Sequence, residues 1–334
     1  MNQVTSDKFR WMAFLSSIMI AMSHATKIVI ESGETFVMLC NQLAVPAMVY
    51  FFLSSAYFHY REYEKSDYVT KLKKRIGTLL VPYVCWNLIG YFLAVWKQYT
   101  TLSVINLAKG MIFVYIPIIN REHEPIVGAL WFIMRLLSFE IAAPVFMWLI
   151  RHKRLFWLVV TSSIFMVIFY DVNYYAFLYW MPFYLIGAYI AYYYHEKVEE
   201  ILSHREEKFN WKCLVCLIVF LLYGIYCMEC RAWEFTYDME RFCAIPLIFV
   251  CMYLINWYPK VNWIVKHNSF YLYCIHIPLI WIFGNWLIRR YDTIYSVNKM
   301  YLILVGIILG ISWSSQWILH KAFPKLEVFL SGNR

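Results

Sequence analysis

Apolar runs of about twenty residues recur along the whole chain, separated by short polar segments. Such a run crosses a bilayer as an α-helix, because hydrocarbon offers the backbone no water to bond. The runs lack the alternation of apolar and polar residues typical of a membrane β-barrel. The pattern predicts an all-α, polytopic integral membrane protein with one domain over residues 1–334. It places about ten transmembrane helices at residues 11–30, 36–58, 76–96, 129–150, 155–170, 176–194, 213–228, 241–258, 268–288 and 299–319.

Two connections between these ranges carry structure of their own. The apolar stretch from Val104 to Ile119 is interrupted by Lys109 and Gly110, which favours a helix on the outer membrane surface over a further span. The hydrophilic segment from His195 to Lys212 is expected to form a short charged helix on the inner face.

The basic residues predict the orientation of the chain. If the N-terminus lies inside, 20 of the 30 Lys and Arg residues fall on the inner side and 9 on the outer side. This agrees with the positive-inside rule and places both termini in the cytoplasm. An alternative interpretation of the start is a signal peptide cleaved after Ser23-His24-Ala25. The apolar character continues to Ile30, however, which favours an uncleaved span.

The composition supports a membrane protein and excludes other classes. The chain is 62% hydrophobic and 15% charged, whereas a soluble domain has about 25% charged residues. The net charge of +9 is spread between the spans and forms no single patch, so we expect no nucleic-acid binding. Two Cys-x-x-Cys pairs, Cys213 with Cys216 and Cys227 with Cys230, have apolar flanks and no histidine pair. They are interpreted as buried free thiols, and no metal site is expected.

Four ionisable residues fall inside the predicted spans and away from their ends, where they are costly and therefore functional candidates: His24, Arg135, Glu140 and His276. A rise of about 1.5 Å per residue groups them by depth. His24 and Arg135 form one layer, and Glu140 and His276 form a second. A third layer, Arg10 and Arg75, marks the cytoplasmic mouth. Structural roles are the alternative: a buried pair or a wet cavity for Arg135 and Glu140, and a hydrogen-bonded structural histidine for His276.

Five patches occur along the chain in a set order: Arg10-x-x-Ala13 with His24-Ala25; Phe51 to Tyr57 with Lys74-Arg75, Pro82-Tyr83 and Trp86; Leu130-Trp131-Phe132 with Pro144; Phe183 to Gly187; and Ser269-Phe270 with Tyr273, His276 and Pro278. Together they resemble the acyltransferase-3 family, integral membrane acyltransferases of bacterial cell-envelope glycans. Arg10 precedes His24 by fourteen residues where the family has about eleven, and Glu140 matches no carboxylate of the family.

The resemblance implies a protein of the bacterial cytoplasmic membrane. Its substrates would be a cytoplasmic acyl-CoA, most commonly acetyl-CoA, and a hydroxyl of an extracytoplasmic or lipid-linked glycan. A hydroxyl needs a positioned base at neutral pH, and neutral histidine suits that role. His24 would act as this base or carry the acyl group itself. Arg75, together with Arg10, would bind the phosphates of coenzyme A. Arg135, at the estimated depth of His24, would stabilise the developing oxyanion.

Two rival functions fit the same pattern of spans. A transporter or flippase for a glycan or a lipid-linked saccharide would also have about ten spans and a few buried charges. A glycan polymerase would usually have larger outer loops. Consumption of an acyl donor distinguishes the acyltransferase from both.

Overall fold

A computed structural model describes residues 1–26, 34–65, 67–116, 121–170, 172–230, 238–291 and 296–332. Within these ranges the chain is helical apart from loops and one small hairpin. The longer helices are α1 (Gln3–Thr26), α3 (Val45–Tyr60), α4 (Tyr68–Trp96), α8 (Lys153–Phe169), α9 (Phe177–Leu202), α10 (Trp211–Cys230), α11 (Met239–Leu254), α12 (Trp263–Tyr291) and α13 (Val297–Ala322). The shorter elements are α2 (Thr35–Gln42), η2 (Tyr63–Lys65), α5 (Val104–Met111), η4 (Gly128–Leu130), α6 (Trp131–Ile141), α7 (Ala143–Arg151), α14 (Pro324–Ser331) and the antiparallel strands β1 (Val114–Ile116) and β2 (Arg121–His123).

Every predicted apolar range overlaps a helix or consecutive helices over most of its length, so the all-α prediction is confirmed for the described residues. The predicted end of the first range, residues 27–30, lies outside them. By length and hydropathy alone, five helical stretches of the described chain could cross a membrane: α2 with α3, α4, α10, α12 and α13. The consecutive helices α6 and α7 would add a sixth, although they meet at an angle of 58°.

The bend between α6 and α7 has a local cause. Pro144 occupies the first turn of α7. A proline has no N–H to donate to the carbonyl of the residue four before it, here Glu140, and its ring clashes with that carbonyl. The break therefore falls at Ala142, two residues after Glu140.

Both predicted connecting segments differ from the expectation. The segment from Val104 to Ile119 is helical only as far as Met111 and continues into the hairpin, so the prediction of one surface helix was too long. The segment from His195 to Lys212 is helical to Leu202, after a kink at Tyr194, and non-helical from 203 to 210. Gly110 and the β-branched residues that follow it favour an early end of α5.

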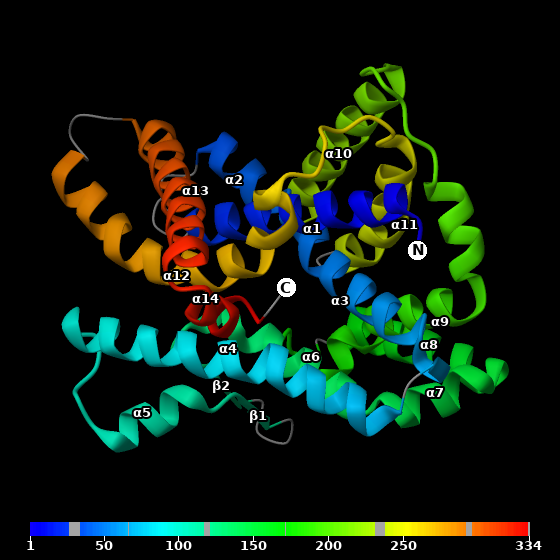
Figure 1. The fold of residues 1–334 in the computed structure, drawn as a ribbon, viewed down its shortest axis with the longest axis horizontal. Coiled ribbons are helices and arrows are strands. Elements are labelled where there is room, and N and C mark those ends of the chain that lie inside the picture. The colour runs from blue at the N-terminus through cyan, green and yellow to red at the C-terminus, as the bar shows by residue number, and fades with distance from the viewer. Residues whose placement is uncertain are drawn as a thin grey trace.

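The helices pack into one body with a shared apolar core (Figure 1). Figure 1 shows α12, α13 and α14 at one side, α7, α8 and α9 at the other, and α5 below α4. Helices α9 and α3 pack closely at Gly187 of α9, where an added Cβ would lie 2.4 Å from the Leu53 carbonyl oxygen of α3. Only glycine permits this approach.

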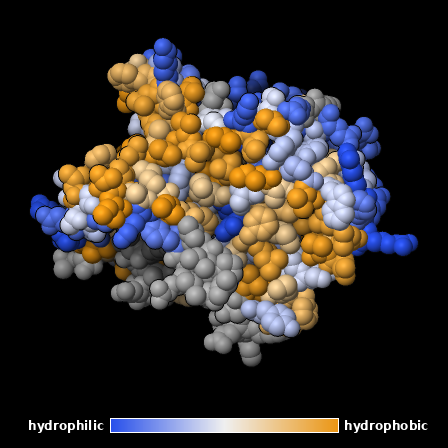
Figure 2. All heavy atoms as spheres, turned by 90° about the horizontal axis from the view of Figure 1, so that it is seen from below, coloured by the Kyte–Doolittle hydropathy of each residue, from blue (hydrophilic) through white to orange (hydrophobic). Residues whose placement is uncertain are grey.

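Apolar residues also cover much of the outer surface. Figure 2 shows one face on which hydrophobic side chains spread widely and hydrophilic ones gather mainly toward the margins. Large exposed apolar side chains include Trp148 on α7, Leu222 on α10 and Trp317 on α13. Such a surface is typical of contact with lipid.

Two basic residues that the charge count treats as loop residues are buried. Lys8 is 2% exposed and its Nζ donates to the Met252 carbonyl oxygen, and Arg241 is 6% exposed. Of the four cysteines in Cys-x-x-Cys pairs, Cys213, Cys216 and Cys227 are buried free thiols, as predicted. The side chain of Cys230 lies outside the described part.

Candidate functional site

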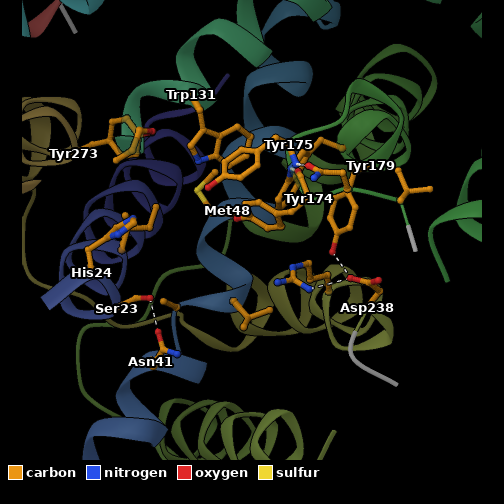
Figure 3. Close-up of a pocket in the computed structure, with 18 residues that line it drawn as sticks. Ser23, His24, Asn41, Met48, Trp131, Tyr174, Tyr175, Tyr179, Asp238 and Tyr273 are labelled. Carbon is orange, nitrogen blue, oxygen red and sulfur yellow. Dashed lines mark hydrogen bonds and ion pairs between the residues drawn. The ribbon is translucent and has the colours of Figure 1, made fainter. Parts of the chain in front are cut away.

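His24 lies in the last turn of α1 and lines a cavity of about 490 Å³ (Figure 3). Its side chain is half-buried, so it can meet a bound molecule while the protein holds it. The neighbouring Ser23 donates from Oγ to the Asn41 Oδ1 of α2 over 2.6 Å. This bond ties the end of α1 to α2 at the wall of the cavity.

The other walls come from segments far away in the sequence. Figure 3 shows His24 and Tyr273 on one side, Tyr174, Tyr179 and Asp238 on the other, and Trp131 between them. The loop before α9 is held by local hydrogen bonds. Tyr175 N–H donates to Asn173 Oδ1 over 2.8 Å, and Trp180 Nε1 donates to the Tyr174 carbonyl oxygen over 2.8 Å.

His276 packs against the His24 ring and does not itself line the cavity. The centroids of their rings are 5.1 Å apart, and His276 is fully buried in α12. His276 Nδ1 lies 3.2 Å from the Leu272 carbonyl oxygen. Because a carbonyl only accepts hydrogen bonds, Nδ1 is the donor in this bond. The His276 ring meets His24 at the end of α1.

Arg135 is buried on α6 and bonded to the loop that lines the cavity. Its Nη2 donates to the Tyr175 carbonyl oxygen, and its guanidinium carbon lies 5.3 Å from the centre of the Phe113 ring and 5.9 Å from that of Phe177. The described residues that line the cavity include Tyr175 but not Arg135. The structure therefore connects Arg135 to the cavity through Tyr175.

Glu140 belongs to a second, separate cluster. Its side chain is fully buried, and its Oε2 lies 2.5 Å from Nδ1 of the equally buried His59. Its Oε1 lies 3.4 Å from Nε of Arg75, whose side chain is 24% exposed. Arg10 pairs with Asp7 on its own helix over 3.2 Å.

These contacts correct the grouping by depth. His24 meets His276, and Glu140 meets Arg75, although the estimate assigns the members of each pair to different layers. The estimate fails because it assumes straight spans with the predicted ends. In the structure α1 begins at Gln3 and α12 at Trp263, several residues earlier than predicted, and α6 ends at a sharp bend.

The two clusters come from opposite ends of the same helices. Met48, near the start of α3, lines the cavity, whereas His59 lies near the end of that helix. Trp131 begins α6 and Glu140 nearly ends it. At about 1.5 Å per residue, the cavity and the Arg75 cluster are about 13–17 Å apart along these helices.

Comparison with protein-family models gives one match, an acyltransferase domain model that covers residues 7–317 of the 334. The chain belongs to the acyltransferase-3 family. It is therefore a membrane acyltransferase, and its apolar helices indicate a multi-pass membrane protein. Comparison with curated protein sequences and with solved structures gives no match.

The patches that resemble the family contribute residues to both clusters of this acyltransferase. His24, Trp131 and Tyr273 line the cavity, Arg75 belongs to the second cluster, and Gly187 lies where α9 packs closely on α3.

The sequence analysis missed several residues of both clusters. His59 lies one residue beyond a predicted span, and its helix in fact continues to Tyr60. Arg241 was counted among the outer topology charges, and Asp238 and Tyr179 were not considered. The available signal was the segment Asp238-Met239-Glu240-Arg241, three charges directly at the start of an apolar run.

Proposed function

We propose that this acyltransferase moves a short acyl group, most commonly acetyl, from cytoplasmic acyl-CoA to a hydroxyl of an extracytoplasmic or lipid-linked glycan in the bacterial cytoplasmic membrane. The observation that carries the proposal is the half-buried His24 at the wall of a cavity of about 490 Å³, in a chain of this family. A cavity of this size suits a small acceptor group.

The directions of the helices support an acceptor site on the outer side. If the N-terminus is cytoplasmic and the ten spans alternate, α1 ends outside, and α6, α9 and α11 begin there. The cavity is lined from these same ends, at His24, Trp131, Tyr179 and Arg241. Arg75 and Glu140 then lie toward the inner ends of α4 and α6, where a cytoplasmic donor would enter.

In the proposed reaction His24 accepts the proton of the acceptor hydroxyl as its oxygen attacks the thioester carbonyl carbon. The carbon–sulfur bond then breaks, and the imidazolium returns the proton to the leaving thiolate of coenzyme A. The products are the acylated hydroxyl and free coenzyme A. In the alternative course the imidazole itself attacks the thioester and transfers the acyl group in a second step.

The arginines take supporting roles in this proposal. Arg75 is oriented by Glu140 through its Nε, its side chain is 24% exposed, and its guanidinium would bind a phosphate of coenzyme A. Arg10, 36% exposed, would add a second positive charge for the donor. Arg135 would act on the reaction through Tyr175, by holding the wall of the cavity.

Proteoliposomes test the sidedness of this function. The purified protein is reconstituted with a glycan acceptor sealed inside, and acyl-CoA with a labelled acyl group is added outside. The proposal predicts label on the glycan from those molecules whose cytoplasmic face points outward, and none in protein-free vesicles. Movement of an unmodified glycan across the membrane without consumption of donor would instead support a transporter or flippase.

A further inference from the structure

One wall of the His24 cavity is aromatic. The ring centroids of Trp131 and Tyr174 are 5.2 Å apart at an angle of 66°, and those of Tyr174 and Trp180 are 5.2 Å apart at 85°. Trp131 and Trp180 are almost completely buried, at 6% and 0% exposure. Because each ring packs edge-to-face on the next, the two buried tryptophans hold Tyr174 in place, and Tyr174 is the partly exposed aromatic ring of this wall.

Beside this wall lies a charged corner formed by the start of α11. Arg241 Nη1 donates to Asp238 Oδ1 over 3.2 Å, and the Tyr179 hydroxyl donates to the same oxygen (Figure 3). The guanidinium carbon of Arg241 lies 5.2 Å from the centre of the Tyr174 ring and 5.6 Å from that of Tyr179. The side chains of Arg241 and Asp238 are only 7% and 17% exposed. Burial of a charged pair costs desolvation free energy, so a buried pair that faces a cavity is a candidate for contact with a ligand.

The combination matches the chemistry of a sugar ring. A pyranose has weakly positive C–H bonds on its faces, which pack on aromatic rings, and hydroxyl groups around its edge. A carboxylate accepts hydroxyl hydrogen bonds and a guanidinium donates them, and both are stronger than bonds between neutral groups. An acyl chain has no hydroxyl groups that could form hydrogen bonds with Asp238 and Arg241.

The corner also indicates the charge of the sugar. Among the described residues, Arg241 is paired with Asp238 and lies 3.6 Å from Oε1 of the fully buried Glu240. Its positive charge is therefore compensated within the protein, so a uronic acid would bring its carboxylate to a corner where Asp238 already pairs with the guanidinium.

We propose that the cavity is an acceptor subsite that binds one neutral sugar residue. Its ring lies against Trp131 and Tyr174, its hydroxyl edge meets Asp238 and Arg241, and a further hydroxyl points to His24. The place of this subsite in the reaction rests on the proposed function, whereas the binding of sugar does not.

The test measures binding of simple glycosides to the full-length protein in detergent by saturation-transfer NMR. The probes are methyl β-glucopyranoside, methyl β-galactopyranoside and methyl β-glucuronide. The variants are Tyr174→Leu, which removes the ring, Tyr174→Phe, which keeps it, and Asp238→Asn. The control is Tyr253→Leu, at a side chain of α11 that is 51% exposed.

We expect at least one neutral glycoside to bind more tightly than the glucuronide. Tyr174→Leu and Asp238→Asn should each weaken its binding by about tenfold, whereas Tyr174→Phe and Tyr253→Leu should leave it within about twofold of the wild type. The inference is overturned if no neutral glycoside binds, if the glucuronide binds best, or if Tyr174→Leu and Asp238→Asn bind like the control.

Release of thiol from acetyl-CoA by the same preparations separates this inference from the proposed function. Thiol release without glycoside binding at the cavity would refute the sugar subsite but not the proposed function. Glycoside binding that depends on Tyr174 and Asp238, without thiol release from any acyl donor, would support the subsite and refute the proposed acyl-CoA chemistry.

Discussion

The buried ion cluster at Glu140 allows a stability prediction with a magnitude. Glu140→Gln keeps the size and shape of the side chain but removes the negative charge that His59 and Arg75 share, at 2.5 Å and 3.4 Å. Glu140 and His59 are 0% and 2% exposed, so water cannot replace the lost interaction.

Removal of one partner of a buried ion pair costs about 3–5 kcal/mol. The lower end applies here because Arg75, with 24% of its side chain exposed, can turn toward water. We therefore expect Glu140→Gln to lose about 3 kcal/mol of stability, which corresponds to a fall in Tm of about 6 °C at about 2 °C per kcal/mol for a large domain.

The assay is thermal unfolding of the purified protein in one detergent, followed by loss of the monodisperse gel-filtration peak. The matched control is Glu64→Gln. Glu64 also pairs with an arginine, Arg151, over 3.1 Å, but the two side chains are 61% and 56% exposed. Because solvent screens an exposed pair, Tm of the control should not change measurably.

A second substitution tests the coupling. His59→Gln alone should also lower Tm, and adding it to Glu140→Gln should cost less than the sum of the two single changes, because they remove the same interaction. The reasoning is refuted if Glu140→Gln unfolds within 1 °C or so of the wild type, or if the two changes are additive.

Three further predictions concern packing and the arginines. Gly187→Ala should lower stability by about 3 kcal/mol, because its Cβ would lie 2.4 Å from the backbone oxygen of Leu53, and an unchanged Tm would contradict this packing. Arg75→Ala should raise KM for acyl-CoA by about tenfold or more with a smaller change in kcat, because it removes a charge proposed to bind phosphate; a pure loss of kcat would speak against donor binding. Arg135→Ala should lower kcat while leaving binding of acyl-CoA nearly unchanged, because Arg135 holds Tyr175 at the cavity, and loss of donor binding would refute that role.

The helices of this protein could be predicted from sequence because one physical constraint dominates. Hydrocarbon forces an apolar segment to satisfy its backbone internally, and the thickness of the bilayer sets its length. The helices at the ten ranges follow from this. The ends of the helices do not, since they depend on capping and on contacts with other segments. His59 was missed for that reason, although it lies only one residue beyond a predicted end.

The partners of the buried polar residues could not be predicted from depth. Depth gives one coordinate, whereas contact also requires the positions of the helices in the membrane plane and their bends. Glu140 meets Arg75 because α4 packs on α6. The cavity could not be predicted for the same reason, because its walls come from several helices. In the sequence, Asp238 and Arg241 look like ordinary loop charges at the end of a span.

Substitution of His24 decides whether this histidine is essential for transfer of the acyl group from acyl-CoA. Wild type and His24→Ala are purified in the same detergent, shown to have equal Tm and gel-filtration profiles, and supplied with acetyl-CoA and an envelope extract as acceptor. The measurement is the release of free thiol. We expect release by the wild type and a loss of about a hundredfold or more in the variant, the usual range for removal of a general base. Equal release by the two proteins would contradict the role of His24 and direct attention to His276, and no release by either across several short acyl donors would contradict acyl-CoA as the donor.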